Sequence, residues 1–495
     1  MQSFRELAAR VPRTGFLALS FAGYLLLTLL APLPPNYQLQ PVADIRTFLP
    51  SLGGGLLYAA LILILYALYA LTLLSLAQEN SWSLWRLLAV AALLAAPVVF
   101  MYPINANDLF RYAIRGVIQS RLGENPYAFA PVDSGDPLLT SLAGEWRNAT
   151  SPYGPLWELT ASALTSVAQN NLLPGMLLFK LLGLFSLLAA AVILYRLFVR
   201  RAGAEGTETA RPLLFAAIWA LNPALLLTFA GNGHNDALMI LFLLFGWSVI
   251  DGGHGGPGFL IMLAAALIKP IALLALPIVF VAEWRRLADG GRRARFLLWV
   301  IPGAALMTWL AFLPFGAPET LLLRLVREAS AGAAFSPSTL LILVAQKLGW
   351  SGSYRPIASF AAAAFAMFYI WLIGRTWKRE GPEVNLALAF WGYLVQALNF
   401  RIWYATWPFP WLIINGFSGK RRGLYGLHVG LWFLLTTQLS VVLYGHIRVV
   451  ALDGDHFLAH LVGVPFVFVL PFMLARWSLG LTLEEFSAPL AGSSE

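Results

Sequence analysis

Long runs of apolar residues, separated by short groups of polar and turn-forming residues, recur from Thr14 almost to the end of the 495-residue chain. Many of these runs reach about 18 residues or more, the length that a helix needs to cross the hydrocarbon core of a bilayer. An outer-membrane barrel would instead show segments of about ten residues with alternating polarity. The pattern therefore predicts an all-α, polytopic membrane protein.

We place about twelve transmembrane helices by the length of each apolar run and by the Pro, Gly and charged residues that interrupt it. The expected ranges are 14–33, 54–77, 84–103, 174–199, 212–230, 236–250, 296–315, 357–376, 384–400, 404–418, 424–445 and 457–475. The series shows no internal repeat and no appended soluble domain, so residues 1–495 are expected to form a single integral-membrane domain.

Two stretches are too polar to lie in lipid and too long to be simple connectors. Residues 104–173 carry six acidic residues and four arginines, and residues 316–356 form another polar connection. We interpret 104–173 as a large external loop that contains short amphipathic helices, and 316–356 as a second external loop.

The segment 258–282 decides the expected topology. It is apolar on both sides of Lys269-Pro270, and proline breaks a helix. If the segment crossed the membrane, 14 Lys and Arg residues would lie on the side of the N-terminus and 17 on the other side, whereas a re-entrant hairpin gives 20 and 11. The positive-inside rule favours the hairpin, with both termini cytoplasmic and both polar loops outside.

Composition narrows the class further. Hydrophobic residues make up 59% of the chain and charged residues only 12%, which excludes a soluble enzyme, a disordered chain and a collagen-like chain. Cytoplasmic Lys and Arg explain the net charge of +9 better than nucleic-acid binding does. There is no cysteine, hence no disulfide. Arg5, Arg10 and Arg13 precede the first apolar run without a small-residue cleavage site, which predicts a retained span.

The first candidate for chemistry is Asp108, which follows the third expected span and opens a segment whose apolar residues recur at helical spacing. Arg111 and Arg115 lie four residues apart on another face of this segment. We expect an amphipathic helix in the membrane interface, with Asp108 at its N-cap. A capping role alone is the simpler interpretation. A carboxylate beside clustered arginines, where a span meets a large external loop, favours a functional site.

Two turns are expected on the same face. Residues 151–155 place two prolines around Tyr-Gly, and a structural turn would explain them. The turn 231–236 joins two apolar spans and contains His234, Asn235 and Asp236, which a connection between helices does not require. Because such residues are costly at a membrane span, a functional role is the default hypothesis for this turn.

Two basic residues stand where an anion can be bound. Arg401 lies among aromatic residues, close to Tyr404, at the expected outer boundary. An aromatic belt with a snorkelling arginine explains this run, and so does a fixed cation for a lipid phosphate. Lys269 lies at the tip of the expected hairpin, where it needs an anionic partner, water or the carbonyls of broken helices.

Taken in order, these segments resemble the GT-C superfamily of integral-membrane glycosyltransferases, and they are most similar to the polyprenyl-phosphate-mannose-dependent α-mannosyltransferases. The resemblance covers roughly residues 84–415. It is carried by RxxxRGxxxxxxGxNPY from Arg111, SPYGPL at 151–156, GxGHND at 231–236, AxxKPxxLLxLP at 266–277 and Arg-x-x-Tyr-x-x-Trp-x-x-Pro from Arg401. No P-loop, dinucleotide-binding glycine pattern or HExxH motif is present, so a sugar donor would have to be carried in the membrane.

The resemblance implies an inverting glycosyltransferase that moves a sugar, mannose in the first place, from polyprenyl phosphate to an acceptor hydroxyl. Asp108 would be the general base of the external catalytic loop 104–173. Members of the superfamily often carry paired acids at this position, whereas this chain has the single carboxylate of Asn105-Ala106-Asn107-Asp108. No cofactor is therefore expected, and a bound divalent metal is in doubt.

The resemblance also implies a set of substrate-binding residues. The cations for the phosphate would be Arg401, Arg147, His234 and Lys269. Asn235 and Asp236 would bind sugar hydroxyls or orient His234. The aromatic side chains of the sugar site would be Tyr127, Tyr153 and Tyr404, and Arg111 and Arg115 complete the set. The expected partners are membrane lipids, the lipid-linked donor and a glycan, glycolipid or protein acceptor, with no nucleic acid. The expected location is the cell membrane, with the active site on the external face.

Two alternatives stay open at the level of the sequence. A secondary transporter or flippase of lipid-linked sugars would share the many spans, the broken segment and the intramembrane lysine, although such proteins usually show internal repeats. A polymerase or ligase that uses a polyprenyl-diphosphate oligosaccharide is the second alternative.

Overall fold

The computed structural model describes residues 11–39, 45–78, 82–205, 211–329 and 335–486. These residues form a bundle of helices, and the extended pairing among them is one isolated bridge between Pro32 and Met101. The all-α prediction is confirmed. Arg5 and Arg10, and the two chain ends that we expect in the cytoplasm, lie outside the described residues.

The first half of the chain contains the helices up to the proposed hairpin. They are α2 (Arg13–Leu30), η1 (Ile45–Thr47), α3 (Leu52–Gln78), α4 (Leu84–Val99), α5 (Asp108–Ser120), η2 (Pro131–Ser134), α6 (Pro137–Ala143), η3 (Gly144–Trp146), α7 (Pro155–Val167), α8 (Leu172–Glu205), α9 (Pro212–Ala220), α10 (Pro223–Leu225), η4 (Leu226–Gly231), α11 (Asp236–Asp251), α12 (Gly255–Ile268), η5 (Pro270–Leu274) and α13 (Ala275–Arg286).

The second half completes the bundle. It contains α14 (Gly290–Phe312), α15 (Glu319–Ala329), α16 (Pro337–Lys347), α17 (Tyr354–Trp377), α18 (Pro382–Gln396), η6 (Ile402–Thr406), α19 (Phe409–Phe417), α20 (Arg421–Val442), η7 (Leu443–Ile447), α21 (Arg448–Ala451), α22 (His456–Phe468) and α23 (Leu470–Phe486). Two of these elements, η4 and η7, are π-helices, which are rare and occur often at functional sites.

Seven helices in the described residues are long and apolar enough to span a membrane, or eight if the bent pair α9 and α10–η4 counts as one span. This supports a multi-pass membrane protein. The expected count of about twelve stays a prediction, because the segments placed at 84–103, 236–250 and 384–400 form helices of only 15 or 16 residues. The segment 404–418 is shorter still: it begins in the 3-10 turn η6, and its helix α19 has nine residues.

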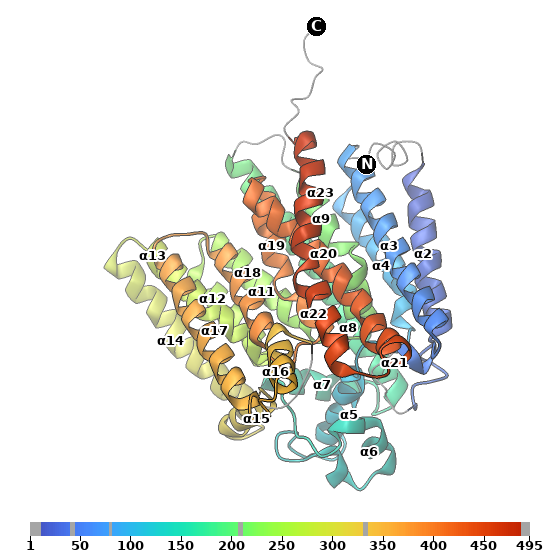
Figure 1. Cartoon of the computed structure of the whole chain (residues 1–495). Helices are drawn as coiled ribbons and strands as arrows, with labels where there is room; N and C mark the ends of the chain where they lie inside the picture. Colours follow the sequence, from blue (N-terminus) through green and yellow to red (C-terminus); the bar gives the residue numbers. More distant parts are fainter. Residues whose placement is uncertain (1–10, 40–44, 79–81, 206–210, 330–334, 487–495) are drawn as a thin grey trace.

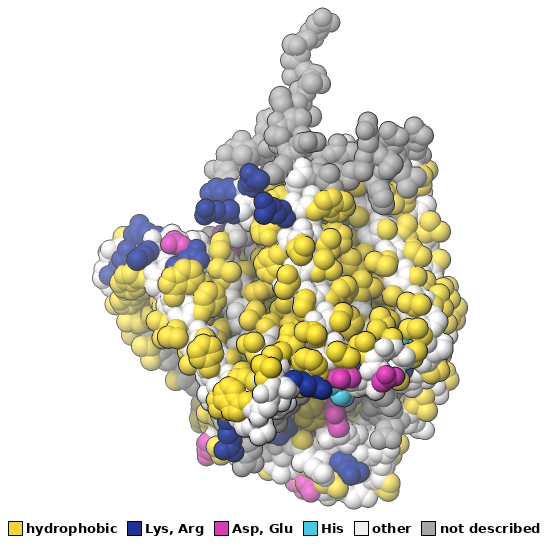
Figure 2. All heavy atoms as spheres, in the orientation of Figure 1, with side chains coloured by type: hydrophobic (Ala, Val, Ile, Leu, Met, Phe, Trp, Pro, Cys, Tyr) yellow, Lys and Arg dark blue, Asp and Glu magenta, His cyan; other side chains and the backbone are white. Residues whose placement is uncertain are grey.

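The bundle has two different ends (Figure 1). The first turn of α2 and the last turn of α23 lie at the upper end, whereas α5, α6, α15, α16 and α21 gather at the lower end. Figure 2 shows a broad band of hydrophobic side chains between a basic upper end and a lower end where acidic, basic and histidine side chains mix. This distribution is the one that a membrane-embedded bundle requires.

The predicted interfacial helix at Asp108 is differently placed from what we expected. It forms as α5, but every residue from Asp108 to Ile118 is buried, and α5 packs against α7, α6 and α8. The cap position is taken by Asn107, whose side chain makes no capping hydrogen bond. The polar face that suggested contact with lipid headgroups instead faces the interior of the protein.

The segment around Lys269 forms two helices that run in opposite directions. A Cβ atom at Gly255, where α12 begins, would lie 2.1 Å from Oε2 of Glu283, near the end of α13, so the two outer ends of the pair meet. The helices are separated at Lys269-Pro270, and the 3-10 turn η5 follows. This is the geometry that a hairpin requires, and its re-entry into a membrane stays a prediction.

Candidate functional site

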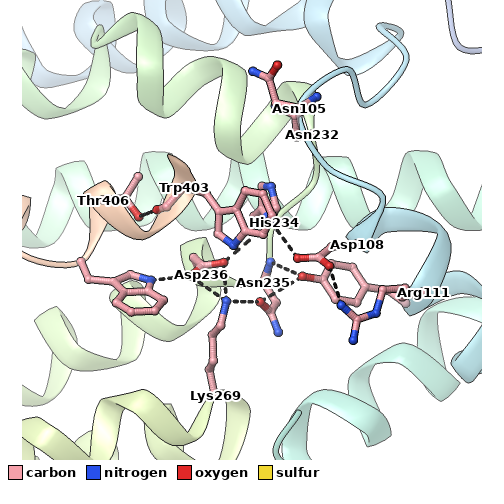
Figure 3. A network of polar contacts seen from close by, with 12 residues as sticks. Asn105, Asp108, Arg111, Asn232, His234, Asn235, Asp236, Lys269, Trp403 and Thr406 are labelled. Carbon is pink, nitrogen blue, oxygen red and sulfur yellow. Dashed lines mark hydrogen bonds and ion pairs between the residues drawn. The ribbon is translucent and has the colours of Figure 1, made fainter. Parts of the chain in front are cut away.

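Three segments that are far apart in the sequence meet at one point in the lower half of the bundle (Figure 3). They are the start of α5, the turn 231–236 that leads into α11, and the break between α12 and η5. The turn η6 closes the site from the opposite side. Asp108, Asp236 and Lys269, one residue from each of the first three segments, are buried there.

Close packing explains why glycine is used in these segments. Gly233 has a φ of +71°, which a residue with a side chain rarely adopts, and it lets the chain turn from η4 into α11. Gly154, at the start of α7, donates its backbone N–H to the carbonyl of Ile268 at 3.0 Å. A Cβ atom at Gly154 would lie 2.1 Å from the carbonyl oxygen of Leu267. The SPYGPL turn therefore docks directly on the tip of the hairpin.

Asp108 is held by two side chains of different character. Its Oδ1 accepts a hydrogen bond from the Arg111 guanidinium at 3.0 Å, and its Oδ2 lies 3.5 Å from Nδ1 of His234. The guanidinium of Arg111 in turn stacks on the ring of Trp146 at 4.1 Å. Arg111 thus has a fixed orientation toward the carboxylate.

The electrostatic surroundings keep Asp108 ionised. Burial by itself raises the pKa of this carboxyl group, but the facing His234 and the positive charges of Arg111 and Lys269 outweigh it and hold the pKa well below its ordinary range. Asp108 is therefore available as a hydrogen-bond and proton acceptor at neutral pH.

Asp236 is sealed more completely than Asp108. Both of its oxygens lie 2.8 Å from Nζ of Lys269, and Oδ1 also accepts a hydrogen bond from the indole N–H of Trp407. The same ammonium lies 3.4 Å from Oδ1 of Asn235, which also accepts a hydrogen bond from the Tyr112 hydroxyl at 3.1 Å. Asp236 is fully buried.

His234 lies between the two carboxylates. Its Nδ1 is 3.5 Å from Oδ2 of Asp108 and 3.8 Å from Oδ2 of Asp236, and its ring stacks on Trp403 with centroids 4.3 Å apart. The imidazole is almost completely buried. It connects the two acids without lying on the surface of the cavity.

A cavity of about 1220 Å³ opens beside this network. Asp108, Arg111 and Lys269 line it, whereas His234, Asn235 and Asp236 are not among its lining residues. The resemblance implied that His234 binds the phosphate and that Asn235 and Asp236 bind sugar hydroxyls or orient His234. The structure places them behind the wall of the cavity, where they orient Lys269 and Asp108.

The lining of the cavity mixes apolar and polar side chains. The segments η5, α15 and α17 contribute mostly apolar residues, which include Ile271, Leu273, Leu325, Ala358 and Ala362, together with Arg355 and Ser359. The loop before α5 and the parts of the chain near α18 and α20 contribute more polar residues, which include Asn105, Asn107, Gln396, Asn399 and Ser440.

Of the other residues that the sequence singled out, three line the cavity and three do not. Arg401, Tyr404 and Tyr153 are part of the lining. Tyr404 also stacks on Trp407 and lies 5.4 Å from the ammonium of Lys269. The substrate-binding roles expected for Arg401, Tyr404 and Tyr153 stay predictions.

Arg147, Arg115 and Tyr127 lie elsewhere. Arg147 is exposed and lines a separate shallow pocket beside α6. Arg115 donates to the carbonyls of Ala149 and Thr150, and Tyr127 donates to the carbonyl of Tyr153 at 2.8 Å. The last two side chains thus fix the loop that carries the cavity residues, in place of the direct contact that we expected.

Three buried side chains near the site were not singled out as candidates in the sequence. Trp403 and Trp407 contact His234 and Asp236, and Trp407 was visible as part of the late Arg-x-x-Tyr-x-x-Trp pattern. Glu158 accepts a hydrogen bond from Ser151 at 2.5 Å, and burial raises the pKa of its carboxyl group. Nothing in the local sequence indicated that Glu158 is buried.

The described residues contain no group of three or more His, Asp and Glu side chains that is arranged to hold a metal ion. In the network itself, the two carboxylates already face Arg111 and Lys269. The chemistry that this arrangement can perform is proton acceptance by Asp108 and binding of an anion by the cations of the cavity.

Residues 14–285 match the family described as "Alpha-(1->6)-mannopyranosyltransferase, N-terminal domain". This range contains Asp108, the turn 231–236 and the hairpin tip, whereas Arg401 and η6 lie beyond it.

Individual relatives carry the same description. "Alpha-(1->6)-mannopyranosyltransferase A" of Mycobacterium tuberculosis is 25% identical over 346 residues, which is 65% of this chain and 63% of that protein. The protein of the same name from Corynebacterium glutamicum is 26% identical over 186 residues, 38% of this chain and 36% of that protein. "Alpha-(1->6)-mannopyranosyltransferase B" of the latter organism is 25% identical over 215 residues. The chain thus matches less than two thirds of the length of these relatives.

Proposed function

The chain belongs to the α-(1→6)-mannopyranosyltransferase family, and from this premise we propose that it transfers a mannosyl group from polyprenyl phosphate to the 6-hydroxyl of an acceptor sugar. The match to the family confirms the resemblance that the sequence motifs indicated. The donor, the acceptor and the side of the membrane are our proposals. The observation that carries the proposed transfer is a carboxylate with a lowered pKa, Asp108, buried at the wall of a large cavity that apolar and cationic residues also line.

In the proposed reaction, Asp108 acts as the general base. The acceptor hydroxyl oxygen attacks the anomeric carbon of the donor, and its proton passes to Asp108 as the new C–O bond forms. The bond between the anomeric carbon and the phosphate oxygen breaks on the opposite face, and the electron pair leaves with polyprenyl phosphate. Inversion at this carbon converts a β-linked donor into an α-glycoside.

A base with a lowered pKa suits this reaction for a physical reason. The acceptor hydroxyl becomes strongly acidic once its oxygen is bonding to carbon, so a weak base that is fully ionised can remove the proton late in the step. The leaving group is a phosphate monoester and needs no proton to depart. The reaction therefore requires one carboxylate and a cationic site for the phosphate.

Arg401 is our first candidate for the phosphate. It lines the cavity, and it is not among the described residues that form an ion pair with a carboxylate. Lys269 also lines the cavity, but Asp236 already neutralises its charge. A phosphate needs a positive charge that no protein carboxylate occupies, which favours Arg401.

The polyprenyl chain would lie along the apolar residues that η5, α15 and α17 contribute to the cavity wall. Tyr354, Arg355, Ala358, Ser359 and Ala362 recur at helical spacing, so one face of α17 borders the cavity, and most of its side chains are small. The acceptor sugar would bind near the polar lining residues Asn105 and Ser440. The catalytic carboxylate would lie where the two substrates meet.

We assign the lower end of the bundle in Figure 1 to the external face of the cell membrane. The assignment rests on the excess of Lys and Arg that the hairpin topology leaves on the side of the N-terminus. It agrees with the basic upper end in Figure 2. Under this assignment the donor reaches the site from the outer leaflet.

The test is a transfer assay with the purified, detergent-solubilised protein and three donors: polyprenyl-phosphate mannose, polyprenyl-diphosphate-linked sugar and a nucleotide-linked mannose. We expect transfer from the first donor alone, to a mannoside acceptor, with an α-(1→6) linkage in the product. Transfer from the diphosphate donor would favour the polymerase or ligase alternative.

A second assay separates the enzyme from a transporter or flippase. In sealed proteoliposomes, movement of a fluorescent lipid-linked sugar between leaflets without formation of a glycoside would contradict the proposed function. We expect a glycoside to form and the rate of lipid movement to equal that of liposomes without protein.

A further inference from the structure

Lys180 is an ionisable residue in the middle of an apolar helix. It lies in α8, within the candidate span Leu172–Gly203, and its side chain is completely buried. An ionisable residue inside a membrane span is costly, so it requires partners and a reason to be there. No acidic side chain of the described residues forms an ion pair with it.

The partners of Lys180 are three backbone carbonyls. Its Nζ lies 2.5 Å from the oxygen of Met101 and 3.5 Å from that of Val98, and it also donates to the carbonyl of Gly231. An ammonium group has three N–H donors and no acceptor, so three carbonyls satisfy it completely. The negative ends of helix dipoles favour a cation in this position.

These carbonyls come from the ends of two helical segments that lead into the site. Val98 and Met101 lie at the end of α4, from which the chain continues to Asp108. Gly231 is the last residue of η4, from which the chain continues to His234 and Asp236. One side chain therefore joins the two segments that carry the two carboxylates.

The packing around Lys180 leaves little freedom. A Cβ atom at Gly183, one turn further along α8, would lie 2.2 Å from the carbonyl oxygen of Phe229 in η4. A Cβ atom at Gly233 would lie 3.3 Å from Cγ of Lys180. The helix α8 thus lies directly against the segment that it orients.

A second connection joins the same two segments closer to the site. The backbone N–H of Asn105 donates to Oδ1 of Asn232 at 3.3 Å, and the Asn232 amide donates to the carbonyl of Leu227 at 3.0 Å. Figure 3 shows Asn105 and Asn232 side by side above His234. Lys180 and Asn232 therefore both constrain the distance between the segment that leads to Asp108 and the segment that leads to His234.

We propose that Lys180 is a positioning residue, which sets the distance between Asp108 and the His234–Asp236 pair from outside the site. The proposal rests on the proposed function, because it gives this distance a role in mannosyl transfer. Asp108 and His234 lie 3.5 Å apart, and a displacement of about 1 Å at reacting groups can reduce a rate by about 100-fold. Lys180 is not among the residues that line the cavity.

The experiment compares Lys180→Met with a matched control on the same helix. Leu187→Ala also alters a completely buried side chain of α8, two turns from Lys180 and beside Trp219 of α9, and should lower the melting temperature. We expect kcat to fall at least about tenfold in Lys180→Met, with KM for the donor within about twofold of wild type. Leu187→Ala should keep the wild-type kcat per folded protein, and Lys180→Arg, which retains N–H donors, should recover part of the rate.

Coupling provides a measurement that a merely structural role would not affect. If Lys180 and Asn232 constrain the same separation, the kcat loss of Lys180→Met combined with Asn232→Ala should be smaller than the product of the two single losses. Should Lys180→Met not accumulate, Gly183→Ala serves in its place, because its Cβ forces α8 away from η4 while the lysine is intact. A kcat of Lys180→Met equal to that of Leu187→Ala, or fully multiplicative losses, would overturn the proposal.

Hydrogen–deuterium exchange keeps this proposal separate from the proposed function. We expect faster exchange in both segments, 101–108 and 231–236, in Lys180→Met, and no change there in Leu187→Ala. Absence of transfer by the wild-type protein would contradict the proposed function alone. Unchanged exchange in both segments would show that Lys180 does not position them.

Discussion

Asp108 and Asp236 are two carboxylates in one network, but their surroundings differ. Asp108 lies at the wall of the cavity, with one oxygen toward Arg111 and the other toward His234. Asp236 lies behind the wall, and Lys269 and Trp407 occupy its oxygens. The difference indicates which acid can meet a substrate and which acid can only hold the structure around it.

Because the surroundings of Asp236 and Asp108 differ, removal of the charged partner should have a different consequence for each acid. A sealed charge has no access to water, so its partner is required for stability. A charge at a cavity wall can be hydrated when its partner is lost, so its partner mainly sets the protonation behaviour.

Removal of the Lys269 charge should destabilise the protein most. In Lys269→Met, Asp236 stays buried without its counter-charge, which costs about 3–5 kcal/mol. We expect a large drop in the melting temperature of the detergent-solubilised protein. The double variant Lys269→Met with Asp236→Asn should regain part of the loss. A melting temperature equal to wild type in Lys269→Met would contradict the sealed role of Asp236.

Removal of the Arg111 charge should change the pH dependence of activity. Asp108 must be ionised to accept a proton, and Arg111 is one of the groups that lower its pKa. In Arg111→Gln the pKa of Asp108 rises, so kcat/KM should begin to fall at a higher pH as the solution is acidified. The loss relative to wild type should therefore be larger at pH 5 than at pH 7.

The matched control for this pH profile is Arg121→Gln, an arginine of the same loop that pairs with Asp136 at 3.8 Å and is largely exposed. Its profile should equal that of wild type. If the acidic limb of Arg111→Gln also coincides with wild type, Asp108 is not the titrating base.

Removal of the Arg401 charge should affect donor binding and little else. A hydrogen bond to a charged group contributes about 1.5–3 kcal/mol, so Arg401→Gln should raise KM for the lipid-linked donor about tenfold or more. Arg147→Gln is the control, because Arg147 lies outside the cavity. Equal KM values for the two variants would remove Arg401 from the phosphate site.

The sequence predicted the fold class and the broken segment at Lys269-Pro270 because both depend on local properties, namely apolar length and a helix-breaking proline. It did not predict that α5 is buried. Its alternation of polar and apolar residues resembles that of an interfacial helix, whereas its polar face is covered by the loop 146–153 and by the site itself. Amphipathicity identifies a polar neighbour without distinguishing lipid headgroups from a buried network.

The site was predicted only in part, because the local sequence does not determine which side chains meet in the fold. The residues of the turn 231–236 are unusual enough to be recognised one by one, but their distances from Asp108 depend on three segments that meet only in the fold. Arg115 and Arg147 look alike in the sequence, yet one supports a loop from within and the other is exposed. Burial of Lys180 against three carbonyls was likewise invisible, although a lysine in an apolar run was a signal to examine.

The most direct test of the central claim is single-turnover mannosyl transfer by Asp108→Asn, with donor affinity measured on the same preparation and Asp236→Asn beside it. We predict that Asp108→Asn binds the donor within a few-fold of wild type and transfers mannose about 10²–10⁴-fold more slowly, the range for loss of a general base. Asp236→Asn should lose mainly stability. Transfer by folded Asp108→Asn at the wild-type rate would contradict the account.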